Sequence, residues 1–395
     1  MKIGECIYLD HQATTPVDPR VLAKMVPYFD VMIGNPHSAD HSLGWESSNA
    51  VESAAASIAR LIGADTDEII FTSGATESNN LALLGLGRRA VNSKRKRILV
   101  SAIEHKCVLS AGRILEDQYG FAVESIPVDP DGFVVLSALE EMLDDNVLAV
   151  SVLAVNNEIG TIQDIKAISK LARGFGSLVH CDAVQAPVAM EVINLAEQTD
   201  LLSLSSHKMY GPKGIGVLYV SRDLQDRIEP LIYGGEQQNG LRSGTLPTPL
   251  CVGMGAAAEN LMKEEIVDKR ETVRRLRDTF IEELAALSWP VVVNGARGNA
   301  QHPGNANLRF TGFSAHDILS TMQPSLAAST GSACTSGTLE PSHVLKAIGL
   351  DSDSAESSIR FSLGFGTTEQ DILDAVGIIE ETLDRLSRAN LVYSA

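Results

Sequence analysis

Three short segments of this sequence carry residue types that can do chemistry. The first runs from Thr72 to Asn79, where a β-branched run ends in a glycine turn and a helical pattern begins. Backbone N–H groups at such a helix start point outward and bind phosphate. An ordinary strand-to-helix turn with a threonine cap explains the same residues, so this segment alone leaves both interpretations open.

The second segment is residues 205–214, SSHKMYGPKG. Lys208 follows an apolar run and precedes a Gly-Pro turn, which predicts a lysine at the edge of a crevice. Lysine forms a Schiff base with an aldehyde cofactor once desolvation lowers its pKa. A plain surface lysine is the alternative.

The third segment is residues 180–185, HCDAVQ. Asp182 ends a run that reads as buried, where a carboxylate is costly unless it is paired. A pyridinium nitrogen is a fitting partner and becomes a better electron sink through the pairing; a helix N-cap aspartate is the alternative. A phosphate cradle, a strand-end aspartate and a strand-end lysine are together the parts that a pyridoxal-phosphate site needs.

A layered scaffold must position these segments. Short apolar, β-branched runs alternate with helical patterns through the first 220 residues. Their hydrophobicity is continuous rather than alternating, which predicts strands buried on both faces of a mostly parallel sheet covered by helices, an α/β domain. The expected strands are residues 69–72, 98–100, 147–155, 178–180, 201–204 and 216–220.

A smaller α+β domain is expected after this region. A long helix begins it, with an apolar stripe at helical spacing that Pro290 stops. A last helix opens with a capping box at Thr367 and Gln370. The stripe of the long helix is Val273, Leu276, Phe280, Leu284 and Leu287, and that of the last helix is Ile372, Val376, Ile379, Leu383 and Leu386.

Composition excludes several functions. The 395 residues carry a formal net charge of −18, which repels nucleic acid and anionic membrane. One basic run, residues 88–97, is interpreted as a solvated helix end, with docking of an acidic partner or an RNA as the alternative. No apolar stretch reaches the length of a membrane span and no signal core opens the chain, so a cytoplasmic protein is expected.

The five cysteines form no CxxC pair, so neither a zinc knuckle nor a disulfide framework is indicated, and a reducing compartment fits. Cys6, Cys107, Cys181 and Cys251 are interpreted as packing residues. His37 and His41 have the spacing of a metal pair, but without an acidic third ligand we favour roles in a loop or the substrate entrance, and no metal site is expected.

The sequence closely resembles the cysteine desulfurases of fold-type I, in the class V aminotransferase group, nearly end to end. The order of the motifs, rather than any one of them, carries this resemblance. They are residues 8–10, 13–16, 34–38, 72–78, 104–106, 155–160, 180–185, 206–214, 242–245, 331–336 and 358–362.

The resemblance implies a role for each matching residue in binding pyridoxal phosphate. Lys208 would hold the cofactor and move the substrate's protons, Asp182 would keep the ring nitrogen protonated, and Gln185 would bond the ring oxygen. His105 would stack on the ring and act as acid or base. The phosphate would be bound by Ala75, Thr76, Ser205 and His207, and by Thr245 reaching over from a neighbouring subunit, which implies a homodimer.

It also implies the substrate, L-cysteine, with Arg360 and Asn157 holding its carboxylate. Cys334 lies in a run of small residues, so a loop is expected at about residues 326–340. Its thiolate would attack the sulfur of the substrate, leaving alanine and a persulfide on Cys334. The sulfur would pass to a protein acceptor for iron–sulfur cluster assembly, tRNA thiolation or DNA phosphorothioation. Cys334 is also a candidate transient ligand of an iron–sulfur cluster.

Other readings stay open at this point. A selenocysteine lyase or an aminotransferase would use the same fold, and a non-catalytic sulfur carrier would not need Lys208. Glu236 departs from the family, since many relatives carry glycine there. The expected division is a large cofactor-binding domain at residues 16–258 and a small domain made of residues 1–15 and 259–395.

Overall fold

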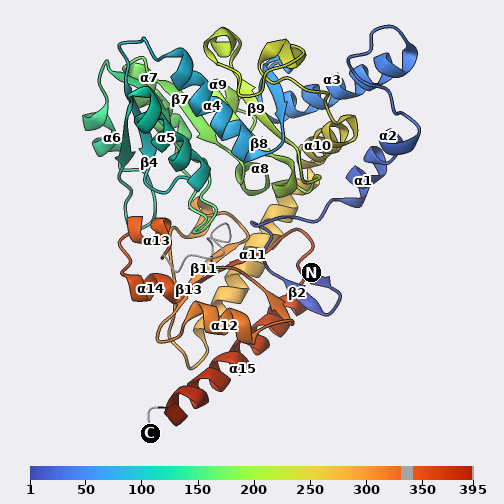
Figure 1. Cartoon of the computed structure of the whole chain (residues 1–395). Helices are drawn as coiled ribbons and strands as arrows, with labels where there is room; N and C mark the ends of the chain where they lie inside the picture. Colours follow the sequence, from blue (N-terminus) through green and yellow to red (C-terminus); the bar gives the residue numbers. More distant parts are fainter. Residues whose placement is uncertain (331–340, 394–395) are drawn as a thin grey trace.

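A computed structural model describes residues 1–330 and 341–393 of the chain. The larger part, at the top of Figure 1, is built on one sheet of seven strands. These strands are β3 (Ile69–Thr72), β4 (Arg97–Ser101), β5 (Ala122–Ile126), β6 (Val147–Ser151), β7 (Leu178–Asp182), β8 (Leu201–Ser205) and β9 (Gly216–Val220).

The sheet is mostly parallel. Its order is β3-β9-β8-β7-β6-β4-β5. Neighbours from β8 to β5 pair in parallel, whereas β9 runs antiparallel to both of its neighbours. The carboxyl ends of every strand except β9 therefore meet at one edge, which is where open α/β sheets bind ligands.

Helices cover both faces of this sheet. Alternate residues of a strand enter different cores: Ile70 packs with one set of helices, and Ile69 and Phe71 with the other. One face carries α4 (Ala75–Arg89) and α5 (Lys106–Tyr119). The other carries α3 (Ser42–Ile62), α6 (Leu136–Met142), α7 (Ile165–Gly174) and α10 (Thr248–Leu261). Shorter helices are α1 (Pro19–Met25), α2 (Pro27–Asp30), α8 (Ala186–Ala189) and α9 (Leu195–Gln198).

The predicted fold class is confirmed, and the strands differ from expectation in two places. The strand expected at residues 147–155 ends at Ser151, because the chain turns there and Val155 makes only an isolated bridge with Ile162. β5 was not expected. It is an edge strand whose residues are mostly exposed or half-buried, so its sequence lacks a continuous apolar run.

The smaller part, at the bottom of Figure 1, has its own core. Phe280, Phe310 and Phe361 meet there edge to face, and Ile7 and Leu9 from the chain start join them. Its elements are β1 (Lys2–Ile3), β2 (Cys6–Tyr8), α11 (Glu265–Ala285), β10 (Val291–Val293), β11 (Asn305–Phe310), α12 (Ala315–Thr321), β12 (Leu326–Ala327), α13 (His343–Ala347), α14 (Ser352–Glu356), β13 (Ser358–Ser362) and α15 (Glu369–Tyr393).

The two main cores support the expected division into residues 16–258 and the two flanking segments, which stays our proposal, and α13 and α14 also pack against Ile103, Leu153 and Ile159 of the larger part. The strand orders of the smaller part are β10-β11-β13, all antiparallel, and β1-β2-β12. In Figure 1, α11 runs from the larger part down into the smaller one. Within the described residues, no helix is long and apolar enough to cross a membrane.

Two details of the last helices correct the sequence prediction. α11 ends at Ala285, so Leu287 lies past the helix and packs only partly against the core. The capping box of α15 is Thr368 with Asp371, one residue later than predicted: the Asp371 N–H donates to Thr368 Oγ1 at 3.2 Å, and the Thr368 N–H donates to the Asp371 carboxylate at 2.8 Å. Thr367 instead accepts from the Gly364 N–H, which takes it out of the cap.

Candidate active site

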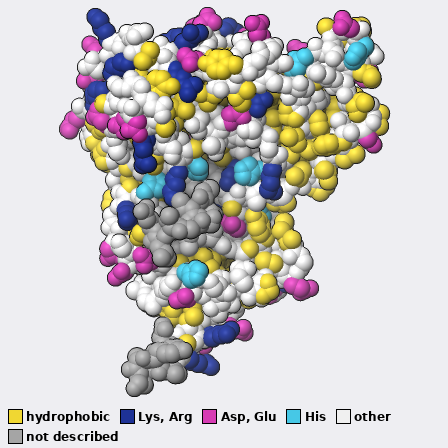
Figure 2. Space-filling view, viewed as in Figure 1, with side chains coloured by type: hydrophobic (Ala, Val, Ile, Leu, Met, Phe, Trp, Pro, Cys, Tyr) yellow, Lys and Arg dark blue, Asp and Glu magenta, His cyan; other side chains and the backbone are white. Residues whose placement is uncertain are grey.

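A cavity of about 560 Å³ lies at the carboxyl edge of the sheet. The chain leaves β3, β4, β6, β7 and β8 directly into its wall, so the parallel sheet gathers residues that are far apart in sequence. Ten predicted site residues line it: Ala75, Thr76, His105, Asn157, Asp182, Gln185, Ser205, His207, Lys208 and Arg360. Figure 2 shows basic and histidine side chains gathered at the waist between the two parts.

One predicted residue does not line this cavity, and another lies outside the described residues. Thr245 is exposed and does not line it. Cys334, with most of the loop expected around it, lies outside the described residues. Their roles therefore stay predictions.

One end of the cavity is built to receive a phosphate. After β3 the chain turns at Gly74, whose φ of +151° is costly for other residues, and α4 begins at Ala75 with its first N–H groups toward the cavity. Lys208 and Lys213 add positive charge to the same wall. Gly216 of β9 lets the strand pack against this turn, because a Cβ there would lie 2.6 Å from the Gly74 Cα.

Beside this end, His207 is a neutral group. Burial, together with the charges of Lys208 and Lys213, lowers the pKa of His207 to about 4. Its Nδ1 lies 3.1 Å from Thr14 Oγ1. A neutral imidazole can donate one hydrogen bond to a phosphate oxygen without adding a charge.

Asp182 lies at the end of β7 and is only 7% exposed. Its carboxylate accepts from Asn79 Nδ2 at 2.7 Å and from the Val184 N–H at 3.1 Å. Both donors are neutral, so the negative charge has no cation bonded to it among the described residues. Glu104 is fully buried, and burial together with the charge of Asp182 raises its pKa well above the usual range.

Lys208 is held by the start of the chain. Its Nζ donates to the carbonyl oxygens of Gln12 and Ala13 at 2.5 and 2.7 Å. Gln185 Nε2 donates to the same Gln12 oxygen at 3.0 Å. Sequence reasoning missed Gln12, although it lies between two motifs of the resemblance, at residues 8–10 and 13–16.

His105 caps α5 and contacts a cysteine. Its Nδ1 lies 2.9 Å from Cys107 Sγ, and the Cys107 N–H donates to it at 3.2 Å. Asn79 Nδ2 also approaches Cys107 Sγ, at 3.3 Å. Cys107 packs against the core on this face of the sheet, as expected, and it also contacts His105 and the Asn79 amide that bonds Asp182. Cys181 and Cys251 are buried, as expected.

Arg360 comes from the smaller part and closes the cavity. Its guanidinium donates to the Asn157 carbonyl, to Asp10 Oδ1 and to Ser329 Oγ, each at 2.7 Å. Its Nε is buried and has no hydrogen-bond partner within the described residues. A side chain that is 3% exposed and held by three partners presents its charge in a fixed direction.

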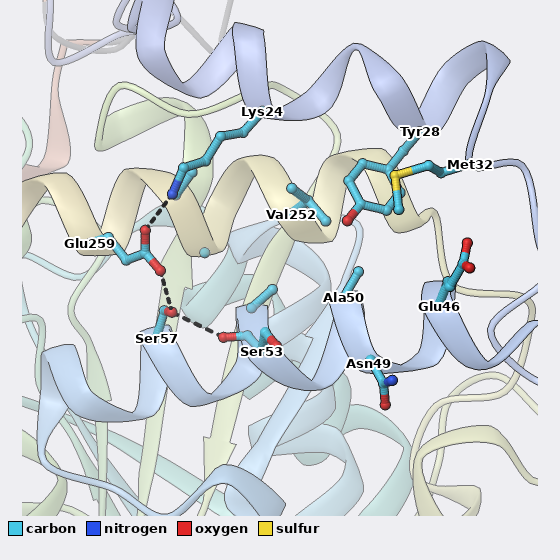
Figure 3. Close-up of a pocket in the computed structure, with 13 residues that line it drawn as sticks. Lys24, Tyr28, Met32, Glu46, Asn49, Ala50, Ser53, Ser57, Val252 and Glu259 are labelled. Carbon is cyan, nitrogen blue, oxygen red and sulfur yellow. Dashed lines mark hydrogen bonds and ion pairs between the residues drawn. The ribbon is translucent and has the colours of Figure 1, made fainter. Parts of the chain in front are cut away.

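A second cavity, of about 400 Å³, lies between α1, α2, α3 and α10 and offers no comparable chemistry (Figure 3). Its lysine, Lys24, pairs with Glu259 at 2.6 Å, and Glu259 also accepts from Ser57 at 3.1 Å. The lysine charge is thus neutralised within the protein. This cavity is not a candidate for the cofactor.

Comparison with known proteins identifies the family of this chain. The family described as aminotransferase class-V matches residues 7–374. The chain belongs to the aminotransferase class-V family. A protein named cysteine desulfurase IscS from Rickettsia akari is 48% identical over 98% of this chain and 93% of its own length. The protein of the same name from Rickettsia bellii is 48% identical over 96% of this chain and 92% of its own length.

Solved structures of class-V relatives have the same fold. One titled NifS-like protein has a TM-score of 0.88 at 33% identity and covers 95% of this chain and 99% of its own. One titled SspA in complex with cysteine has a TM-score of 0.79 at 36% identity, and the match covers 91% of this chain and 99% of its own. The resemblance to cysteine desulfurases is therefore confirmed, and with it a pyridoxal-phosphate enzyme of fold-type I.

The cavity fits that cofactor. A helix start with two lysines suits its phosphate, and a buried carboxylate bonded only to neutral donors suits a protonated ring nitrogen. The departure at Glu236 has a visible cost: its φ of +61° is a conformation that glycine adopts without strain, which explains the glycine of many relatives.

The histidine pair His37 and His41 has other contacts. His41 caps α3, its Nδ1 accepting from the Gly44 N–H at 3.1 Å, and the His37 N–H donates to Asn35 Oδ1. In the parts of the chain that the structure describes, no cluster of three histidine, cysteine or acidic residues gathers that could hold a metal ion.

Glu77, at the phosphate end, gives a pH-dependent prediction. Burial raises its pKa, but hydrogen bonds from Arg242 at 2.8 Å and from Ser73 at 2.7 Å outweigh burial, so the pKa lies below its usual value. Because the pKa of Glu77 is lower in the folded than in the unfolded state, the pair stabilises the protein at any pH above the unfolded-state pKa. This stability is lost as the pH falls through the folded-state pKa.

We therefore expect Glu77→Gln to lower the free energy of unfolding by about 1–2 kcal/mol at pH 7. The deficit should shrink below about pH 4, near the ordinary glutamate pKa. Urea titrations across this range measure it, with the exposed Glu380→Gln on α15 as control. A deficit that is constant with pH would contradict the role given to the pair.

Proposed function

We propose that this protein is a cysteine desulfurase that converts L-cysteine to L-alanine and keeps the sulfur as a persulfide on Cys334. The observation that carries the proposal is one cavity where Lys208, Asp182 and the start of α4 converge, in a chain 48% identical to a named cysteine desulfurase over 98% of its length. The relatives named IscS and NifS support the same activity.

When bound, pyridoxal phosphate supplies an electron sink for bonds at the substrate's α-carbon. The N–H groups of Ala75 and Thr76, with Ser205 and His207, would hold its phosphate. The Asp182 carboxylate would keep a proton on the ring nitrogen. Gln185, which donates to the Gln12 carbonyl, would orient the ring oxygen.

The substrate would be held by its carboxylate. Arg360 lies at the cavity wall, ion-paired with Asp10, and its guanidinium would bind the carboxylate by hydrogen bonds; the Asn157 carbonyl that holds it belongs to the second proposed ligand. Lys208 Nζ would remove and return protons at the substrate carbons, while the Gln12 and Ala13 carbonyls hold that nitrogen in place. His105 would stack on the ring and move a proton at its Nε2.

The sulfur step needs no outside oxidant. The Cys334 thiolate attacks the substrate sulfur, an S–S bond forms, and the C–S bond breaks. The electron pair of that bond stays with the carbon, which takes up a proton and becomes the methyl group of alanine. Both products therefore arise in equal amounts.

For Cys334→Ala we expect loss of sulfide and of alanine together, while the visible absorbance of the bound cofactor stays. The measurement incubates purified protein with L-cysteine and a reductant and determines both products. Cys6→Ala, which changes a half-buried cysteine of the smaller part, is the matched control and should stay active.

Sulfide release by Cys334→Ala at the native rate would overturn the role of Cys334. Release of neither product by a native protein that carries cofactor would overturn the desulfurase itself. It would favour another reaction of the fold, such as that of a selenocysteine lyase or an aminotransferase.

We also propose a homodimer with shared sites. A group of apolar side chains on α1, α2, the start of α3 and the segments between them is between 45% and 71% exposed, and Figure 2 shows hydrophobic side chains gathered on this side of the molecule. Such a patch is unusual on a monomer. The group is Leu22, Val26, Phe29, Val31, Ile33, Leu43 and Trp45.

Subunit mixing tests whether Thr245 serves the neighbouring site. A Thr245→Ala subunit keeps its own Lys208 and, in a mixed dimer with a Lys208→Ala subunit, receives an intact Thr245. One complete site then forms, so we expect the mixture to exceed the average turnover of the two parent variants. Thr245→Ala alone should bind cofactor about tenfold more weakly, because one hydrogen bond to a charged group is lost. Activity equal to the average would show that Thr245 does not act across subunits.

The acceptor of the sulfur is proposed by class only. We infer a protein acceptor, because a persulfide is handed on by direct thiol attack. The 48% identity to a protein named cysteine desulfurase IscS supports a sulfur-acceptor role, and the candidate destinations are iron–sulfur cluster assembly, tRNA thiolation and DNA phosphorothioation. The cysteines that the structure describes are all unpaired thiols, which supports the cytoplasm as the compartment.

A further inference from the structure

A small cavity lies directly behind the active site, between the chain start, the larger part and the smaller part. Its volume is about 20 Å³, enough for one water molecule. It shares Gln12 and Gln185 with the cofactor cavity. Its other polar wall residues include His11 and His302.

Three buried nitrogen atoms of this wall have no hydrogen-bond partner within the described residues. They are His11 Nε2, Gln12 Nε2 and His302 Nε2. Their residues are 4%, 2% and 4% exposed. A buried polar group without a hydrogen-bond partner destabilises the fold, so three around one cavity require an explanation.

The other contacts of these residues fix which nitrogen donates. His11 Nδ1 lies 3.0 Å from the Ser362 carbonyl oxygen, which can only accept, so Nδ1 carries the proton and Nε2 is an acceptor. His302 Nδ1 accepts from the Gly304 N–H at 3.0 Å, so His302 Nε2 carries the proton and is a donor. Gln12 Oε1 accepts from Asn305 at 2.6 Å, which leaves Gln12 Nε2 as a donor.

Both imidazoles are neutral, as this assignment requires. Burial lowers the pKa of His11 to about 4. Burial and the charge of Arg277 lower the pKa of His302 to about 3. The wall therefore offers two donors and one acceptor.

We propose that this cavity is a binding site for one water molecule, which accepts from Gln12 Nε2 and His302 Nε2 and donates to His11 Nε2. Water has the two lone pairs and the proton that this set requires. An ammonium or metal ion does not fit, because two of the three wall groups are donors. The site does not depend on the proposed function.

The water would complete the hydrogen bonding of Gln12. The other polar groups of Gln12 are already used: its N–H donates to Ser362 Oγ, its carbonyl accepts from Lys208, and its Oε1 accepts from Asn305. Its amide nitrogen alone remains. The chain start holds Lys208 through the carbonyls of Gln12 and Ala13. By bonding both Gln12 and His302, the water would link this segment to the smaller part.

A crystal structure of the protein with its cofactor, at a resolution that orders buried waters, tests the site. The expected result is one density peak of water size within hydrogen-bond distance of all three nitrogen atoms. A cavity without density would overturn the proposal. So would a peak whose distances and neighbours identify an ion.

A double-mutant cycle gives a test in solution. His11→Leu and His302→Leu each remove one partner of the water, so each should lower the melting temperature by a few degrees, and the double variant little further than the worse single one. The pair His11→Leu and His180→Leu is the control, because His180 is also buried and neutral but bonds Ser151 instead of the water. In this pair the fall in melting temperature of the double variant should equal the sum of the two single falls. Additive losses for His11 and His302 would overturn the proposal.

Discussion

The active site depends on one buried negative charge. Asp182 lies at the end of β7, and the groups around it favour their neutral forms: burial raises the pKa of Glu104, burial lowers the pKa of His180 to about 4, and Asn79 is an amide. A carboxylate in such a place is costly without a cation. The protonated ring nitrogen of pyridoxal phosphate is the cation that this arrangement fits, so a charge that would destabilise the apo chain becomes the anchor of the cofactor.

The fold supplies the other contacts through strand direction. Because all strands but β9 run the same way, residues that follow β3, β4, β6, β7 and β8 meet at one edge. The start of the chain and the smaller part then close this edge, with the Gln12 carbonyl on Lys208 and with Arg360 on Asn157. Substrate and cofactor would therefore be held by two parts of the chain that have separate hydrophobic cores.

Sequence patterns predicted the cavity residues that lie at strand ends or in the motifs of the resemblance. Asp182 and Lys208 each follow a continuous apolar run, and the resemblance supplied His105, Asn157 and Arg360, all of which line the cavity. The roles of Gln12 and Asn79 were missed: Gln12 acts through its backbone carbonyl, and Asn79 ends the segment predicted to bind phosphate but bonds Asp182 instead. The cap of α15 was one residue off, since threonines occupy both 367 and 368 and only tertiary contacts select between them.

The turnover of Asp182→Asn tests the account most directly, measured as alanine formed from L-cysteine by protein saturated with pyridoxal phosphate. The substitution keeps the shape and removes the charge. The account predicts a fall of about a hundredfold or more, because the ring nitrogen loses the charge that keeps it protonated. Asp164→Asn, at the start of α7 and outside the cavity, should stay active. Native turnover in Asp182→Asn would contradict the central role given to this buried charge.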